Sequence, residues 1–200
     1  MRNNRKSETT KVEQQKAVLV ALGSNQSSVA GGPGATVTRA MQMIENKGLR
    51  IQATSRLYTN PAFPAGSGTD YTNAVVVFES SLPCAKILQI LHEIEASLGR
   101  ERTVRWGART VDLDLLAVGD TVLPDVATQN RWRTLSLEEQ MRQTPEQLIL
   151  PHPRLQDRAF VLVPMAEIAP DWLHPILKKT VLQMLNDLPQ QDRDDVRPSE

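Results

Sequence analysis

Two aspartates that stand close together in sequence form the chain's most suggestive chemical group. Asp112 and Asp114 are separated by one leucine in an apolar segment that is predicted to be a strand. Because side chains alternate between the two faces of a strand, both carboxylates point to the same side, roughly 7 Å apart. Such a pair can share hard cations. Mg²⁺ is the natural candidate, since it takes one or two carboxylates and fills its other positions with water and phosphate oxygens.

The segment before this strand is rich in arginine. It contains Arg100, Arg102, Arg105 and Arg109 but only one acid, Glu101. Guanidinium groups match phosphate oxygens in charge and geometry. Metal-binding carboxylates beside such arginines suit phosphoryl transfer, because that reaction depends on positioning and on neutralising charge.

Each of these features also has an ordinary interpretation. A lone Asp-x-Asp on a strand is most often a solvated face, and Trp106 alone is more often a packing residue. A basic loop with an aromatic on an antiparallel sheet could also bind RNA. The paired carboxylates count against RNA, because they would repel its phosphates in the absence of metal. The closeness of the two charge sets favours metal-assisted transfer but does not identify the donor or the acceptor.

The remaining sequence predicts the elements that position these residues. Helical spacing predicts two helices that end at Gly48 and Gly99. The order is βαββαβ, which predicts an α+β fold with a ferredoxin-like antiparallel sheet and helices packed on one face. C-terminal additions over 159–168 and 180–188 are expected to be helical or mixed. The predicted strands cover 17–22, 49–58, 71–79 and 111–118, and a turn at Gly119-Asp120 predicts a hairpin into 121–123.

Length and composition indicate one domain. The chain has 200 residues, of which 40% are hydrophobic, and this is enough for an ordinary core. We expect a disordered tail over 1–16, a single domain over 17–188 and a polar, frayed end over 189–200. The domain contains an insertion at 126–147. Within it Ser136 and Glu139 match a capping box, which predicts a short helix over 136–142.

Several classes of protein are excluded or disfavoured. Lys+Arg and Asp+Glu balance at 23 each, so no overall charge favours a nucleic acid or a membrane as partner. Cys84 is the only cysteine, which excludes an internal disulfide and a cysteine metal cage. No apolar run approaches the ~18 residues of a transmembrane helix. The polar start lacks the apolar core of a signal peptide, so we expect a cytoplasmic protein.

The segment from Arg105 to Leu116 resembles the signature of the 6-hydroxymethyl-7,8-dihydropterin pyrophosphokinase family. The resemblance covers about Ala17 to Pro175 and rests on the order and spacing of several short motifs. It implies the transfer of pyrophosphate from MgATP to 6-hydroxymethyl-7,8-dihydropterin in folate biosynthesis, giving the pterin diphosphate and AMP. The other motifs are Gly23-Ser24-Asn25, Ser55 to Pro61, Asp70 to Ala74, Glu93 to Arg100, and Leu150 to Phe160.

The resemblance implies roles on the nucleotide side of the site. Asp112 and Asp114 would be metal ligands and would hold two magnesium ions that bridge the ATP phosphates. Arg100 and Arg109 would stabilise the moving pyrophosphoryl group. Glu95 would support the site from the second helix. The residues that would help to hold ATP are Arg102, Arg105, Trp106, His152 and Arg158.

It also implies a pterin pocket. The ring would lie between Tyr71 and Phe160, an arrangement in which a flat heterocycle gains from stacking. Asn73 would read the polar edge of the ring, since an amide offers both a donor and an acceptor. Asn60, Pro61 and Phe63 would complete the pocket.

The chain also departs from the family pattern. Ala108 stands where Pro is common, and Asn60 stands where Thr is common. The insertion at 126–147 could be a lid, an oligomer contact or a surface decoration. No residue stands out as a general base, so Asp114 or a metal-bound water as proton acceptor is only a hypothesis.

Other functions remain open at this stage. They are another magnesium-dependent nucleotide transferase or hydrolase on the same scaffold, an RNA-binding module, and an inactive interaction protein. For the leading hypothesis we expect ATP and the pterin as partners, with no nucleic acid and no membrane. We expect a monomer, with a dimer as the alternative.

Overall fold

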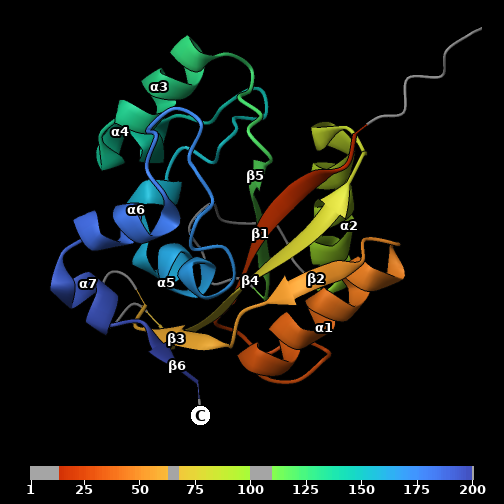
Figure 1. Ribbon diagram of the computed structural model, residues 1–200. Coiled ribbons are helices and arrows are strands. Elements are labelled where there is room, and N and C mark those ends of the chain that lie inside the picture. The colour runs from red at the N-terminus through yellow and green to blue at the C-terminus, as the bar shows by residue number, and fades with distance from the viewer. Residues whose placement is uncertain (1–13, 63–67, 100–109, 200) are drawn as a thin grey trace, which may run out of the picture.

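A computed structural model describes residues 14–62, 68–99 and 110–199 (Figure 1). Its first elements follow the predicted βαββαβ order, except that the second strand is split in two. These elements are β1 (Lys16–Ser24), α1 (Pro33–Asn46), β2 (Ile51–Thr54), β3 (Tyr58–Asn60), β4 (Tyr71–Ser80), α2 (Cys84–Ser97) and β5 (Asp112–Val118). The C-terminal part adds α3 (Val126–Thr134), α4 (Leu137–Arg142), a 3-10 turn (Leu155–Asp157), α5 (Ala159–Ile168), α6 (Val181–Asp187), α7 (Gln190–Asp194) and β6 (Arg197–Pro198).

The strands form one antiparallel sheet. Their order is β5-β1-β4-β3-β6, and β2 also pairs with β4. The two central strands, β1 and β4, are mostly buried, as their continuous apolar runs predict. This arrangement confirms the predicted ferredoxin-like α+β fold.

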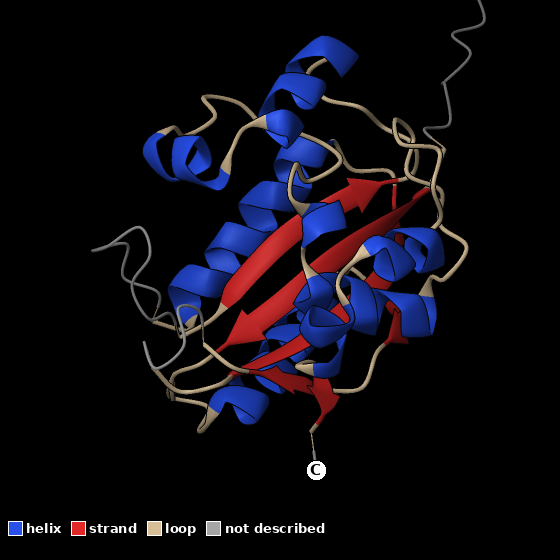
Figure 2. Cartoon of the chain, turned by 90° about the vertical axis from the view of Figure 1, so that its left-hand side faces the viewer, coloured by secondary structure: helices blue, strands red, loops and turns tan. Residues whose placement is uncertain are grey.

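Helices cover both faces of the sheet (Figure 2). Val20, Val76 and Leu115 belong to the core beneath α1 and α2. Leu19 and Val75, one position along each strand, point to the opposite face and pack with residues of α5 and α6. The expectation of helices on one face therefore holds for α1 and α2, whereas α5 and α6 lie on the other face, which no local sequence pattern predicted.

The predicted strand over 49–58 is interrupted at residues 55–57. Ser55 keeps this break attached to β4, since its N–H donates to Val75 O and its hydroxyl accepts from Val75 N, each at 3.0 Å. The chain then resumes as β3, in which Tyr58 lies opposite Asn73 and Asn60 opposite Tyr71.

The predicted hairpin at 119–123 is wrong. The Gly119 N–H donates to Ala17 O on β1, and its carbonyl accepts from the Trp172 indole at 3.2 Å. These partners occupy the polar groups at the turn, and no return strand follows it. Leu123 instead forms an isolated bridge with Leu150.

The insertion and the C-terminal end are both structured. Ser136 and Glu139 form the expected capping box at the start of α4, which confirms a short helix there. Residues 189–199 are polar in composition, yet they form α7 and β6, and β6 pairs with β3. Among the described residues, the structure has no helix with the length and apolar character needed to span a bilayer.

Candidate active site

Asp112 and Asp114 lie on the face of the sheet that α5 covers. Both are partly exposed, whereas Leu113 and Leu115 are buried on the opposite face against α1 and α2. The period of two that placed both carboxylates on one side is therefore confirmed. Their cross-strand neighbours on β1 are small, since Asp112 lies opposite Gly23 and Asp114 opposite Ala21.

Glu95 holds the strand between these two carboxylates. Its side chain is buried, with 1% exposed, and its Oε1 accepts a hydrogen bond from Leu113 N at 2.8 Å. In the described sheet β5 is an edge strand, so this carboxylate takes a bond that a further strand would otherwise accept. Glu95 therefore holds the backbone of β5 between the two carboxylates, and its supporting role in the site stays a prediction.

Arg158 joins the carboxylates to α5. It is the N-cap residue of that helix, and its Nη1 donates to Asp114 Oδ2 at 2.9 Å. Its guanidinium carbon also lies 5.6 Å from the centre of the Phe160 ring. A residue predicted to bind ATP thus touches both a predicted metal ligand and a predicted stacking aromatic.

His152 lies beside the same group. Its N–H donates to Leu116 O at 2.8 Å, which joins the segment to β5, and its Nδ1 accepts from Arg154 N at 3.1 Å. Burial and the charge of Arg158 hold the pKa of His152 well below its usual value, although Asp112 acts in the opposite direction. The ring is therefore neutral near pH 7. Because Nδ1 accepts, its proton is on Nε2, where it can be donated to a ligand.

An amide pair lies on the other side of Gly23. Asn73 is 5% exposed, and its Nδ2 donates to Asn60 Oδ1 at 2.6 Å. A Cβ atom at Gly23 would stand 3.0 Å from Asn73 Oδ1, so this position leaves room for the amide. Asn60 also donates to Pro61 O at 2.8 Å. Tyr71 lies opposite Asn60 and shares its face of the sheet.

The two halves of the site are close because Gly23 lies between them. It pairs with Asp112 on one side and with Asn73 on the other. Neighbouring strands are about 4.8 Å apart, so the backbones at Asp112 and Asn73 are separated by roughly 10 Å. The sheet thus brings a carboxylate pair and an amide pair onto one surface.

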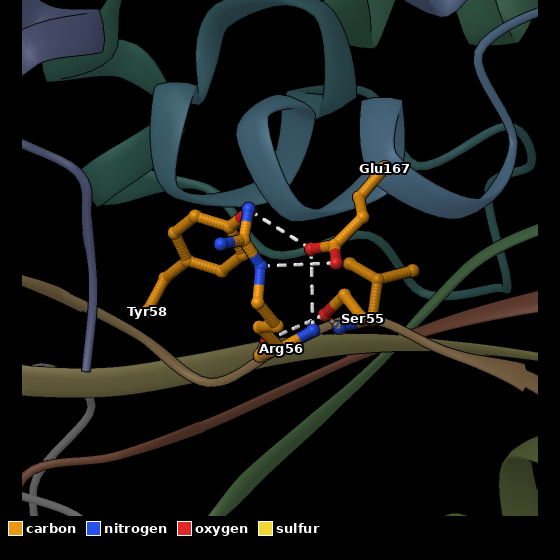
Figure 3. Close-up of polar contacts among 5 residues, drawn as sticks. Ser55, Arg56, Tyr58 and Glu167 are labelled. Carbon is orange, nitrogen blue, oxygen red and sulfur yellow. Dashed lines mark hydrogen bonds and ion pairs between the residues drawn. The ribbon is translucent and has the colours of Figure 1, made fainter. Parts of the chain in front are cut away.

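Figure 3 shows a cluster that the sequence did not predict. The Tyr58 hydroxyl on β3 donates to Glu167 Oε2 on α5 at 2.8 Å. Arg56 donates to the same carboxylate from its backbone N and its Nε, at 3.2 and 3.1 Å. The cluster ties the C-terminal part of α5 to the β2–β3 connection. Tyr58 falls within a family motif, but no sequence signal pointed to Glu167.

The described residues include part of the predicted site. The described residues bring Asp112, Asp114, His152, Arg158 and Phe160 together, and Asn60, Pro61, Tyr71 and Asn73 lie on or next to β3 and β4. Phe63, Arg100, Arg102, Arg105, Trp106 and Arg109 lie outside the described residues.

The carboxylate pair fits magnesium that arrives with a nucleotide. Within the described residues, no three His, Cys, Asp or Glu side chains are grouped so that they could enclose a metal ion. Two partly exposed carboxylates on one face suit a cation that takes its other ligands from phosphate and water. A closed structural metal site would need more protein ligands.

Comparison with known proteins gives the family. Residues 19–170 match the family described as 7,8-dihydro-6-hydroxymethylpterin-pyrophosphokinase. The chain belongs to this family. It is 34% identical over 153 residues to a 2-amino-4-hydroxy-6-hydroxymethyldihydropteridine pyrophosphokinase of Methylorubrum extorquens. The matched residues are 76% of this chain and 82% of that protein.

Two further proteins are similar to this chain. An enzyme of the same name from Synechocystis is 40% identical over 138 residues, which are 69% of this chain and 60% of that protein. This chain therefore matches less than two thirds of the Synechocystis protein. The crystal structure of Plasmodium falciparum HPPK-DHPS has a TM-score of 0.61 and 14% identity, and the match covers 88% of this chain and 45% of that one. That likeness supports the fold alone.

Proposed function

We propose that this protein transfers pyrophosphate from magnesium-bound ATP to 6-hydroxymethyl-7,8-dihydropterin. The main observation is that the Asp112–Asp114 pair and the Asn60–Asn73 pair share one face of the sheet, roughly 10 Å apart across Gly23. The carboxylates suit the metal-bound phosphates, and the amides suit a polar heterocycle. The reacting groups of two substrates would meet between them.

On the nucleotide side, Asp112 and Asp114 would hold two magnesium ions that carry the phosphates. Bound magnesium supplies neutralisation of the phosphate charge. His152 would donate from Nε2, and Arg158 would contact the phosphates from the start of α5. Arg100 and Arg109 would stabilise the transferred group, and Arg102, Arg105 and Trp106 would complete the ATP site.

On the pterin side, Asn73 would read the polar edge of the ring. Its bond to Asn60 uses one amide proton, so its oxygen and its second proton remain for a ligand. Tyr71 and Phe160 would stack on the ring from β4 and α5, with Pro61 and Phe63 at the margin of the pocket. A buried, pre-oriented amide loses little freedom on binding, which favours specific recognition.

The hydroxymethyl oxygen would attack the β-phosphorus of ATP, and the bond from that phosphorus to the α,β-bridging oxygen would break. The pterin gains the diphosphate, AMP leaves, and the hydroxyl proton is lost. A loose transition state asks little of a base. Asp114 as proton acceptor is our hypothesis. Asp114→Asn tests it, because a lost base would not be restored by saturating magnesium, whereas weakened metal binding would be.

The decisive experiment measures AMP formed from ATP and 6-hydroxymethyl-7,8-dihydropterin with magnesium. Wild type should release AMP only when the pterin is present, and Asp112→Ala should abolish this release. Asp120→Ala, an exposed aspartate beyond the same strand, is the matched control and should keep full activity. ADP as product would overturn pyrophosphoryl transfer, and the absence of any nucleotide product would overturn the enzyme itself.

A second pair of variants tests the substrate. Tyr71→Ala and Asn73→Ala should cripple transfer to the pterin. They would leave activity intact in an enzyme that used the same carboxylates on another acceptor. We also propose that the protein acts as a monomer, and gel filtration at the assay concentration tests this.

A further inference from the structure

The residues that flank the insertion at 126–147 are joined by a backbone bridge between Leu123 and Leu150. Leu123 N donates to Leu150 O at 2.9 Å, and Leu150 N donates to Leu123 O at 3.1 Å. Leu150 is completely buried. This bridge holds the two ends of the insertion together. If the insertion were only a surface decoration, it would need no further contact with the rest of the fold.

The first helix of the insertion, α3, is nevertheless fixed in place. Asp125 caps it, with Oδ1 accepting from Thr128 N at 2.8 Å and Oδ2 from the Thr128 hydroxyl at 2.9 Å. The helix buries Gln129 and Trp132 and leaves Val126 about half exposed. A helix with one buried side and one exposed side is docked on the protein. This observation argues against a freely moving lid.

Gln129 connects α3 to the segment that carries His152. It is completely buried, and its Nε2 donates to Pro151 O at 3.2 Å. Withdrawing an amide from water is costly unless its polar groups have partners. Among the described residues the buried Oε1 of Gln129 has no hydrogen-bond partner, so the bond from Nε2 is the one that offsets this cost. The group that it binds is the carbonyl of the residue directly before His152.

The Leu150–His152 turn is therefore held from three sides. Leu150 is held by Leu123, Pro151 by Gln129, and His152 by its bond to Leu116 O on β5. The first and third contacts connect the turn to the body of the fold. The second comes from the insertion and acts on the peptide group that sets the direction of the His152 side chain.

We infer that α3 positions His152 for the nucleotide, with Gln129 as the positioning residue. This inference rests on the proposed function, in which the His152 ring donates to ATP. Gln129 itself does not contact the ligand. It binds the carbonyl of Pro151, the residue before His152, and acts through that peptide group. Without its bond, the Pro151 carbonyl loses its partner, and the peptide before the imidazole is held only by the contacts of Leu150 and of His152 N.

The test replaces Gln129 by methionine, which has a similar length but no amide. A lost hydrogen bond of ordinary strength should raise KM for ATP about three- to tenfold, with KM for the pterin unchanged. Arg131→Met, an exposed position on the same helix, is the matched control and should leave both constants unchanged. Gln129→Glu, which keeps the shape but presents an oxygen to the Pro151 carbonyl, should behave like Gln129→Met or worse.

A spectroscopic measurement separates positioning from a general loss of structure. The chain has three histidines, so the imidazole signals in a proton–nitrogen NMR spectrum can be assigned by substituting each in turn. In ligand-free Gln129→Met, the His152 signal should move and that of His92 should not. An unmoved His152 signal or an unchanged KM for ATP would overturn the inference. So would an equal rise of both Michaelis constants with a lower Tm.

The same data distinguish failure of the inference from failure of the proposed function. If wild type neither binds ATP nor forms AMP, the proposed function fails. The His152 signal of the ligand-free variant still reports whether α3 orients the ring. If wild type is active and Gln129→Met matches it in every measurement, only the positioning role fails.

Discussion

The guanidinium of Arg158 lies 2.9 Å from Asp114 Oδ2, so a cation from α5 already occupies one oxygen of a proposed metal ligand. Arg158 and magnesium would therefore compete for Asp114 in the absence of nucleotide. With ATP bound, the guanidinium would turn to phosphate and the competition would end.

This competition predicts that Arg158→Ala strengthens metal binding but weakens ATP binding. Mn²⁺ should bind the nucleotide-free protein a few-fold more tightly, because a partly exposed ion pair contributes up to about 1 kcal/mol. KM for ATP should rise about tenfold or more, because a charged hydrogen bond to phosphate is lost. Calorimetric titration with Mn²⁺ and steady-state assays measure the two effects. Arg197→Ala, on the far edge of the sheet, should change neither, and weaker Mn²⁺ binding in Arg158→Ala would contradict the competition.

Replacing Glu95 should affect both the stability of the protein and its magnesium requirement. Glu95→Ala leaves the Leu113 N–H without the partner that it has at 2.8 Å, directly between the two aspartates. The free energy of unfolding should fall by about 1–3 kcal/mol, and the magnesium concentration for half-maximal activity should rise.

The neighbouring Glu93 supplies the control, because it is partly exposed and paired with Lys47 on the surface. Glu93→Ala should cost less than about 1 kcal/mol in urea unfolding. Glu95→Gln keeps an acceptor and should lie between the two. Equal stability of Glu95→Ala and Glu93→Ala would show that the bond to β5 contributes nothing.

The Tyr58–Glu167 bond predicts coupling between β3 and α5. Tyr58→Phe removes the hydroxyl that donates to Glu167 at 2.8 Å and should lower stability by about 0.5–1.5 kcal/mol. A double-mutant cycle with Glu167→Gln measures the coupling directly, since the second change should cost less once the first is made. Strict additivity of the two changes would exclude the tie. Thr59→Ser, at the next residue of the strand, should have little effect.

The elements that the sequence predicted are those with a local pattern. The apolar runs of β1 and β4, the alternation at Asp112–Leu113–Asp114 and the glycine stops after α1 and α2 are all confirmed. The predicted family is confirmed as well, since residues 19–170 match it. The placement of both aspartates on one face followed from the period of a strand alone.

The features that the sequence missed depend on distant partners. The break at residues 55–57 is fixed by Val75 and by Glu167, which lies 111 residues from Arg56. Gly23 separates the two halves of the site only because β1 pairs with both β4 and β5. The roles of all the site residues, described or not, stay predictions from the family resemblance, so mutagenesis has to test them.

The contacts of residues 189–199 indicate that the folded unit extends beyond residue 188. The sequence suggested a domain that closes at residue 188. Beyond this position Val196 is buried against Tyr58 and Ala159, and Ser199 N donates to Leu57 O at 2.8 Å. Removing residues 189–200 should therefore lower Tm and raise KM for the pterin more than KM for ATP, because β3 carries Asn60.

A point variant keeps this prediction free of truncation effects. Val196→Ala should cost about 1–2 kcal/mol, as expected for removal of buried methyl groups. Asp192→Ala, exposed on α7, should be neutral. If the chain shortened to residue 188 unfolds at the wild-type temperature, the folded unit ends where the sequence suggested.

His174 predicts how stability depends on pH. The ring is completely buried, and its Nδ1 accepts from Ile176 N and Leu177 N, each at 3.2 Å. Burial, and then the charge of Arg133, lower the pKa of His174 from 6.5 to about 4. Between these values the unfolded chain binds a proton that the folded chain does not, so stability falls as the pH drops from 6.5 to about 4. The full loss is about 3 kcal/mol, at 1.36 kcal/mol per pH unit.

His174→Asn should remove this part of the pH dependence. An asparagine oxygen can accept the same two backbone N–H groups but does not titrate in this range. Urea unfolding at pH 7 and pH 4.5 measures the difference for wild type and variant. The pKa of His152 is also lowered, and its contribution of the same sign stays in both proteins and cancels in the comparison. A slope in His174→Asn as steep as that of wild type would show that His174 does not set it.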